Sequence, residues 1–158
     1  MKTINLLLIV FTITLFSCNT KVKTETVKDP PKEIVAKTVY ENLGGAEGIS
    51  VIVDDIVDLH IKNEHIKHYF IPLQKDSVYF NQFKQHVKDF LASGTGGQEK
   101  YTGRDMSGTH ANLNLSEADF LYAIDDILLV LDTHKIDRAA RNEVLAVLFS
   151  LKWSIIKQ

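Results

Sequence analysis

The sequence predicts an all-α domain that follows a short apolar segment and a polar linker. From residue 38 onward, apolar residues recur at steps of three and four, and the alternation typical of strands is absent. The chain has 158 residues, of which 45% are hydrophobic, and a formal net charge of −2. These values suit one globular domain with an ordinary core. Because the chain is not strongly basic, no nucleic-acid partner is expected.

The N-terminus has the pattern of a secretory signal peptide. Lys2 carries a positive charge, and residues 5–16 form an uncharged, mainly apolar run that ends at Ser17 and Cys18. The run is too short for a membrane span, so residues 1–17 are interpreted as a signal peptide. Cys18 is the only cysteine, which excludes a disulfide within the chain.

The sequence Leu15-Phe16-Ser17-Cys18 resembles a bacterial lipobox, in which the cysteine becomes the lipidated first residue after cleavage. The resemblance implies a lipid anchor at Cys18 and a membrane-attached protein on the periplasmic or outer-membrane side of a bacterium. A plain secretory signal and a retained anchor are the alternatives. Residues 18–37 are polar, contain Pro30-Pro31 and lack a periodic apolar face, so they are expected to form a tether. The folded domain is expected over residues 38–158.

Capping residues and glycines mark the ends of five predicted helices. Thr38 and Glu41 fit a capping box that starts a short first helix, which Gly44 and Gly45 end. A second helix is predicted over residues 46–62, and a glycine cluster after residue 93 ends the third. The last three helices are expected to be capped by Ser77, Ser116 and Asp137.

His110 is the strongest candidate for a ligand. It follows a glycine-broken segment that comes after the apolar third helix, and Met106 lies one turn before it. A neutral imidazole that is held by a short element and faces an apolar helix can supply an axial ligand to haem iron. A surface or capping histidine is the alternative that this residue alone leaves open.

Four motifs in a fixed order resemble the truncated haemoglobins, most closely group 1. The similarity covers roughly Thr38 to Lys157. It implies a two-over-two helical sandwich around haem b, with His110 as the proximal ligand and a pocket between the second and third helices and the last two. The motifs are Tyr40-Glu41-Asn42-Leu43-Gly44-Gly45, Lys88-Asp89-Phe90-Leu91, Gly96-Gly97, and Tyr101-Thr102-Gly103-Arg104 followed by Met106 and His110.

The resemblance also implies a set of apolar residues that bind the cofactor. Phe70 matches the phenylalanine that globins stack on the haem face, and ordinary core packing is its alternative role. The other expected haem contacts are Phe83, Val87, Phe90, Leu91, Met106 and Phe120.

The distal side departs from the pattern of the family. Val57 and Val87 stand where group 1 members usually carry a tyrosine and a glutamine, so two hydrogen-bond donors are missing. His86 matches a position where some cyanobacterial and algal members carry a histidine that ligates the iron from the distal side. A partly exposed surface histidine is the alternative.

The remaining polar candidates are basic residues and histidines. Arg104 and Lys84 could pair with haem propionates, and solvation is the alternative for Lys84. His134 is expected to be solvated. Histidines 60, 65 and 68 are not expected to form a metal site, because the sequence places no carboxylate or thiolate cluster with them.

The implied function is the binding of oxygen or other diatomic gases at haem iron. One alternative is a haem enzyme that detoxifies nitric oxide or peroxide, which would need a reductase or another external electron donor. The other is a sensor or redox protein with a bis-histidine haem.

Overall fold

The computed structural model describes residues 37–157, and every regular element in that range is helical. The predicted signal peptide, the lipidated Cys18 and nearly all of the predicted tether lie outside the described residues. The elements are α1 (Val39–Asn42), α2 (Gly45–Lys62), α3 (Lys67–Phe70), the 3-10 helix η1 (Ile71–Lys75), α4 (Ser77–Gly94), α5 (Met106–His110), α6 (Glu117–Thr133), α7 (Arg138–Ser150) and α8 (Lys152–Ile155).

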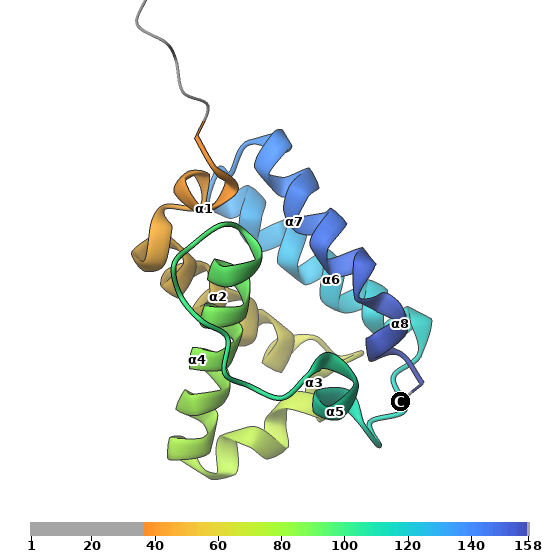
Figure 1. The fold of residues 1–158 in the computed structure, drawn as a ribbon. Helices are drawn as coiled ribbons and strands as arrows, with labels where there is room; N and C mark the ends of the chain where they lie inside the picture. Colours follow the sequence, from red (N-terminus) through yellow and green to blue (C-terminus); the bar gives the residue numbers. More distant parts are fainter. Residues whose placement is uncertain (1–36, 158) are drawn as a thin grey trace, which may run out of the picture. The chain divides into compact units, whose positions relative to one another are not determined.

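Four long helices form the body of the domain, as Figure 1 shows. Helix α2 packs against both α4 and α6, and α7 lies beside α6. The apolar residues of α2 recur at helical spacing, so they share one face of the helix. That face is buried in the core of the domain. The all-α prediction is confirmed. The core joins Ile49, Ile52, Val53, Ile56 and Val57 of α2 to Leu131 of α6 and Val144 of α7.

The local helix signals behave largely as the sequence predicts. Thr38 and Ser116 each form a complete capping box, and the Asp137 side chain accepts a hydrogen bond from the Ala140 amide. The cap of α4 is Asp76, so the assignment of Ser77 as the cap is wrong. The Asp76 carboxylate accepts from the amides of Val78 at 2.9 Å and Tyr79 at 3.1 Å, which satisfies two free donors at once.

Helix α1 is joined to the segment that follows α4. The Tyr40 amide donates to the Thr95 carbonyl at 3.0 Å, and the Tyr40 hydroxyl donates to Glu99 Oε1 at 2.8 Å. The hydrogen bond to Glu99 raises the pKa of the Tyr40 hydroxyl. Gly44, with a φ of 89°, reverses the chain between α1 and α2 in a region that favours glycine.

Helix α5 is a single turn whose position depends on its surroundings. The Asp105 side chain caps it by accepting from the Gly108 amide at 2.6 Å. Helix α8 packs against α5, and the Lys157 amide donates to the Leu115 carbonyl at 2.9 Å. The C-terminal end of the chain therefore supports the element that carries His110. Across residues 37–157, no helix combines the length and the apolar character needed to cross a membrane.

Candidate haem site

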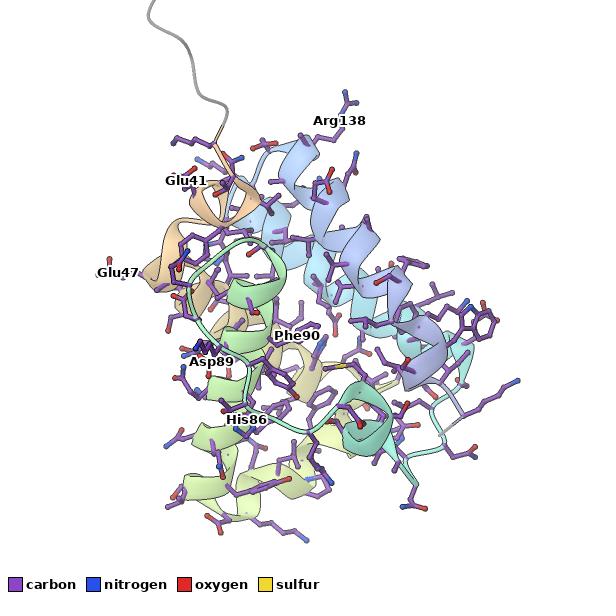
Figure 2. All side chains as sticks on the ribbon, in the orientation of Figure 1. Glu41, Glu47, His86, Asp89, Phe90 and Arg138 are labelled. Atoms are coloured by element: carbon purple, nitrogen blue, oxygen red, sulfur yellow. The ribbon has the colours of Figure 1, made fainter. Side chains whose placement is uncertain are left out.

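The site is a cavity of about 460 Å³ between α4 and residues 101–110. Its volume lies within the roughly 300–1,000 Å³ of small-molecule sites. Figure 2 shows His86 and Phe90 on the side of α4 that faces this segment. The lining consists of Tyr79, Gln82, Phe83, His86, Val87 and Phe90 from α4, and Tyr101, Arg104, Met106, Thr109 and His110 from the facing segment.

The geometry of His110 suits a neutral ligand. Its Nδ1 lies 2.7 Å from the Met106 carbonyl oxygen. A carbonyl oxygen can only accept, so Nδ1 carries the proton and Nε2 keeps its lone pair. Burial lowers the pKa of His110, the hydrogen bond to Met106 opposes that shift, and the nearby Arg104 lowers the pKa further. The imidazole is therefore neutral at physiological pH, with one nitrogen free to bind a metal.

The α4 wall brings together most of the side chains expected there. Phe83, His86, Val87 and Phe90 follow one another at steps of three, one and three, so they share a face of the helix. Met106 lines the opposite wall. The cavity therefore has mainly apolar walls, with a histidine on each side.

Three of the predicted cofactor contacts lie outside the lining of this cavity, and their contact with haem stays a prediction. The Phe70 ring lies 6.3 Å from the Phe83 ring, centroid to centroid. Leu91 packs against the main core. Phe120 is buried in a second cluster and meets the Phe149 ring edge-on at 5.4 Å.

Neither α2 nor the last two long helices contribute to the lining of this cavity, so the expected extension of the haem pocket to them stays a prediction. The inward side chains of α6 and α7, including Leu131 and Val144, instead fill the core with α2. Val57 is also part of that core and is 1% exposed. It therefore lies outside the cavity wall.

Several polar groups of the lining were not anticipated as site residues. Tyr79 and Gln82 extend the α4 wall beyond Phe83, toward the start of the helix. The hydroxyls of Tyr101 and Thr109 both donate to the Arg104 carbonyl, at 2.6 and 3.2 Å. Tyr101 was recognisable only as part of a motif, because a hydrogen bond to a backbone carbonyl leaves no signal in side-chain spacing.

Lys84 has a different partner from the haem propionate that was considered for it. The Lys84 ammonium lies 2.9 Å from Asp54 Oδ1, and Lys88 lies 2.9 Å from Asp54 Oδ2. Burial raises the pKa of Asp54, but the hydrogen bonds from both lysines outweigh it and hold the pKa below 3.8. Lys84 is therefore neither solvated nor directed to a propionate in this structure.

His134 is also not simply solvated, because its Nε2 lies 2.7 Å from Asp55 Oδ2. Arg104, in contrast, lines the cavity as expected. Within residues 37–157, no group of three His, Cys, Asp or Glu side chains could hold a metal ion. His60, one of the three histidines considered for such a site, is buried against Asp126.

Comparisons with known proteins agree with this architecture. The family model of the Bacterial-like globins matches residues 38–156. The group 1 truncated hemoglobin of Tetrahymena pyriformis is 30% identical over 112 residues, which cover 71% of this chain and 88% of that protein. A group 1 truncated hemoglobin of Synechocystis sp. is 31% identical over 114 residues, which cover 70% of this chain and 88% of that protein.

Solved structures give the same result. The Fe(III) form of the Tetrahymena pyriformis truncated hemoglobin superposes with a TM-score of 0.69 at 25% identity, covering 77% of this chain and all of that one. The 2/2 hemoglobin of Synechococcus sp., solved in the cyanomet state with covalently attached heme, superposes with a TM-score of 0.64 at 25% identity. The match covers 73% of this chain and 94% of that one.

The helical sandwich and the histidine-lined apolar cavity define a haem-binding globin. The chain belongs to the Bacterial-like globin family, among the group 1 truncated haemoglobins. Its cofactor is haem b. The cavity fits that cofactor, because its walls are apolar and the His110 Nε2 is available as a ligand.

Proposed function

We propose that this globin binds oxygen or another diatomic gas at haem iron held by His110. Haem, when bound, supplies an iron centre that takes up small gases and exchanges single electrons. One observation carries the proposal: the Met106 carbonyl fixes the His110 tautomer, so that Nε2 of a neutral, half-buried imidazole is the free nitrogen.

The rest of the cavity supports this role. Phe83, Val87 and Phe90 exclude water from the α4 side, which suits a flat apolar cofactor. Arg104 supplies a cation at the edge of the cavity, where it is suited to pair with a propionate. Val87 lines the cavity and cannot donate a hydrogen bond to a gas, so weak retention of oxygen is expected.

A second candidate function is that of a redox or sensor protein with two histidine ligands. It is favoured because His86 and His110 line the same cavity from opposite elements. In that case an external gas has to wait until His86 leaves, and its apparent affinity falls by the fraction of open cavity. A reductase or another electron donor would be needed for turnover in either role.

The location of the protein is part of the proposal. The apolar run before Ser17 and Cys18 supports secretion, lipidation at Cys18 and attachment to the periplasmic or outer-membrane side of a bacterial membrane. The polar residues 18–37 would then serve as a tether for the globin domain.

The decisive test is haem retention by His110→Ala. The variant is expected to lose haem during gel filtration, or to regain haem binding when free imidazole is added in place of the missing side chain. His65→Ala is the matched control, because His65 lies outside the cavity and stacks on Tyr122 with ring centroids 3.9 Å apart. Unchanged haem occupancy and an unchanged Soret band in His110→Ala would refute the assignment.

A further inference from the structure

Tyr101 is the side chain that connects the two walls of the haem cavity. Its ring meets the edge of His86 with centroids 6.2 Å apart and an angle of 78° between the planes. The Tyr101 ring also contacts the Phe90 ring, with centroids 5.5 Å apart and an angle of 78° between the planes. Both distances lie in the range of favourable edge-to-face pairs. His86 and Phe90 are four residues apart on α4, so one ring covers a full turn of that helix.

The other end of Tyr101 is fixed. Its hydroxyl donates to the Arg104 carbonyl at 2.6 Å, and Tyr101 is half-buried. Gly103 makes room for the ring, because a Cβ at that position would lie 2.5 Å from Tyr101 Cζ, closer than real contacts allow. A side chain held at its tip and along its face loses little further freedom when it contacts His86.

The hydrogen bond also decides what Tyr101 does not do. Its hydroxyl proton is directed to a backbone carbonyl of its own segment, so it is not free for a gas in the cavity. The contribution of Tyr101 to the site is therefore the placement of its ring.

We propose that Tyr101 is a positioning residue that keeps the His86 imidazole in the cavity and so controls the entry of small gases. The proposal rests on the proposed haem site. The edge contact opposes rotation of His86 away from the wall, and the bond to Arg104 keeps the Tyr101 ring from following. Loss of the Tyr101 ring leaves His86 with a larger set of orientations, and the cavity opens more often.

A double-mutant cycle on carbon monoxide binding tests the proposal. Four haem-loaded ferrous proteins are compared by flash photolysis: the parent, Tyr101→Leu, His86→Leu and the double variant. Tyr101→Leu is expected to speed carbon monoxide association about fivefold in the parent and to have no effect when His86 is already leucine. Tyr101→Phe keeps the ring but loses the bond to Arg104, so an effect of about twofold is expected.

Tyr122→Leu is the matched control, since it removes a tyrosine of α6 that lies outside the cavity lining. Its association rate is expected to equal that of the parent. Equal effects of Tyr101→Leu in both backgrounds would overturn the proposal, as would no effect in either. If Tyr101→Leu does not retain haem, the same cycle is run with Tyr101→Phe, which must speed association in the parent and have no effect when His86 is leucine.

A second measurement reads His86 directly, without gas binding. Diethyl pyrocarbonate modifies accessible imidazoles, and cleavage before aspartates gives a fragment of residues 76–88 whose only histidine is His86. Modification of this fragment is expected to be faster in haem-loaded Tyr101→Leu than in the parent or in Tyr122→Leu. Equal rates in all three would refute a positioning role. Because haem retention through His110 is tested separately, failure here leaves the proposed function standing.

Discussion

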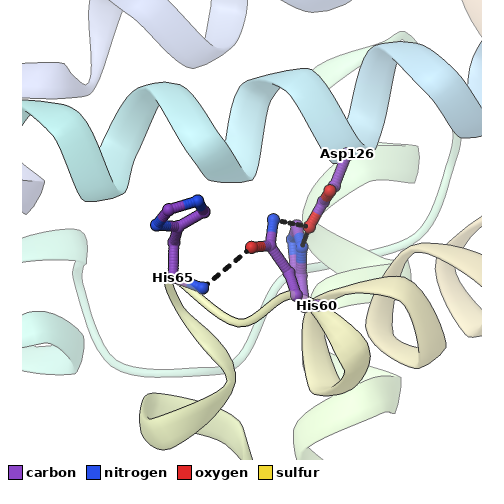
Figure 3. Close-up of polar contacts among 4 residues, drawn as sticks. His60, His65 and Asp126 are labelled. Atoms are coloured by element: carbon purple, nitrogen blue, oxygen red, sulfur yellow. Dashed lines mark hydrogen bonds and ion pairs between the residues drawn. The ribbon is translucent and has the colours of Figure 1, made fainter.

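His60 and Asp126 form a buried hydrogen-bonded pair that joins α2 to α6, with His60 Nδ1 2.9 Å from Asp126 Oδ2 (Figure 3). Both residues are buried, at 6% and 8% exposure. The Asn63 amide donates to the same carboxylate oxygen at 2.9 Å. The His60 ring also lies 4.9 Å from the Phe70 ring, centroid to centroid, and the Phe70 ring in turn contacts Phe83 of the cavity wall.

Removal of the Asp126 carboxylate should destabilise the fold. Asp126→Ala leaves the buried His60 donor and the half-buried Asn63 donor without their acceptor, at a cost of about 1–3 kcal/mol for His60. The free energy of unfolding in urea measures the loss. Asp125→Ala, which alters the exposed neighbouring carboxylate, is the control and should change stability by less than about 0.5 kcal/mol. Equal stability of the two variants would contradict the assigned role of Asp126.

Stability should fall as the pH drops below neutrality. Burial lowers the pKa of His60 below 6.5, although the hydrogen bond and the charge of Asp126 oppose the shift. Between that lowered pKa and 6.5, the unfolded chain binds more protons than the folded one. The contribution of His60 is therefore fully present above pH 6.5 and is lost progressively below it.

His60→Gln tests the pH dependence, because it removes the titrating group. The slope of unfolding free energy between pH 7 and pH 5 should be smaller in the variant than in the parent. The acid-side contribution of Asp54 falls in a separate window, since its pKa lies below 3.8 and its stabilisation is lost only as the pH falls through that range. An identical slope in both proteins between pH 7 and pH 5 would argue against a lowered pKa for His60.

The spectrum of the reduced protein should report whether His86 binds the iron. If it does, the ferrous protein is low-spin and six-coordinate without added ligand, and His86→Leu becomes five-coordinate. The absorption spectrum of the two ferrous proteins is the measurement. A parent that is high-spin and spectrally identical to the variant would assign His86 to the cavity wall alone.

Restoring the usual tyrosine of the family at residue 57 should fail to slow oxygen release. Val57 is 1% exposed within the main core, so Val57→Tyr overpacks it and should cost about 1–3 kcal/mol of stability. Val51→Tyr is the matched control, since Val51 is on the same helix but 53% exposed. A stable Val57→Tyr protein with slower oxygen release would place residue 57 against the haem.

Lipidation should occur at Cys18. Intact-mass measurement of membrane-extracted protein is expected to show an acylated chain that begins at this residue, and Cys18→Ser is expected to abolish the modification. A soluble product that begins elsewhere, or a retained Met1, would refute the anchor.

The features that the sequence predicted correctly depend on neighbours along the chain. The capping boxes at Thr38 and Ser116 and the shared face of Phe83 and Phe90 arise within one or two turns. Most residues of the cavity lining were predicted from their shared face on one helix and from the family resemblance.

Contacts between distant segments could not be predicted in this way. His60 and Asp126 are 66 residues apart, and His134 and Asp55 are 79 apart. Single-sequence spacing does not indicate such pairs, because they depend on how α2 and α6 pack. Val57 and Phe120 were assigned to the haem side from the family resemblance. The structure places Val57 in the main core and Phe120 in the second cluster, and the contact of Phe120 with haem stays a prediction.

The two hydrogen bonds of Tyr40 give α1 a mechanical role. A pull on the chain ahead of Thr38 reaches Tyr40 within one helical turn and passes through its amide to Thr95 and through its hydroxyl to Glu99. Glu99 lies two residues before Tyr101. Tension at the N-terminal side of this domain would therefore be carried into the segment that lines the cavity as well as into the core, against which Val39 and Tyr40 pack.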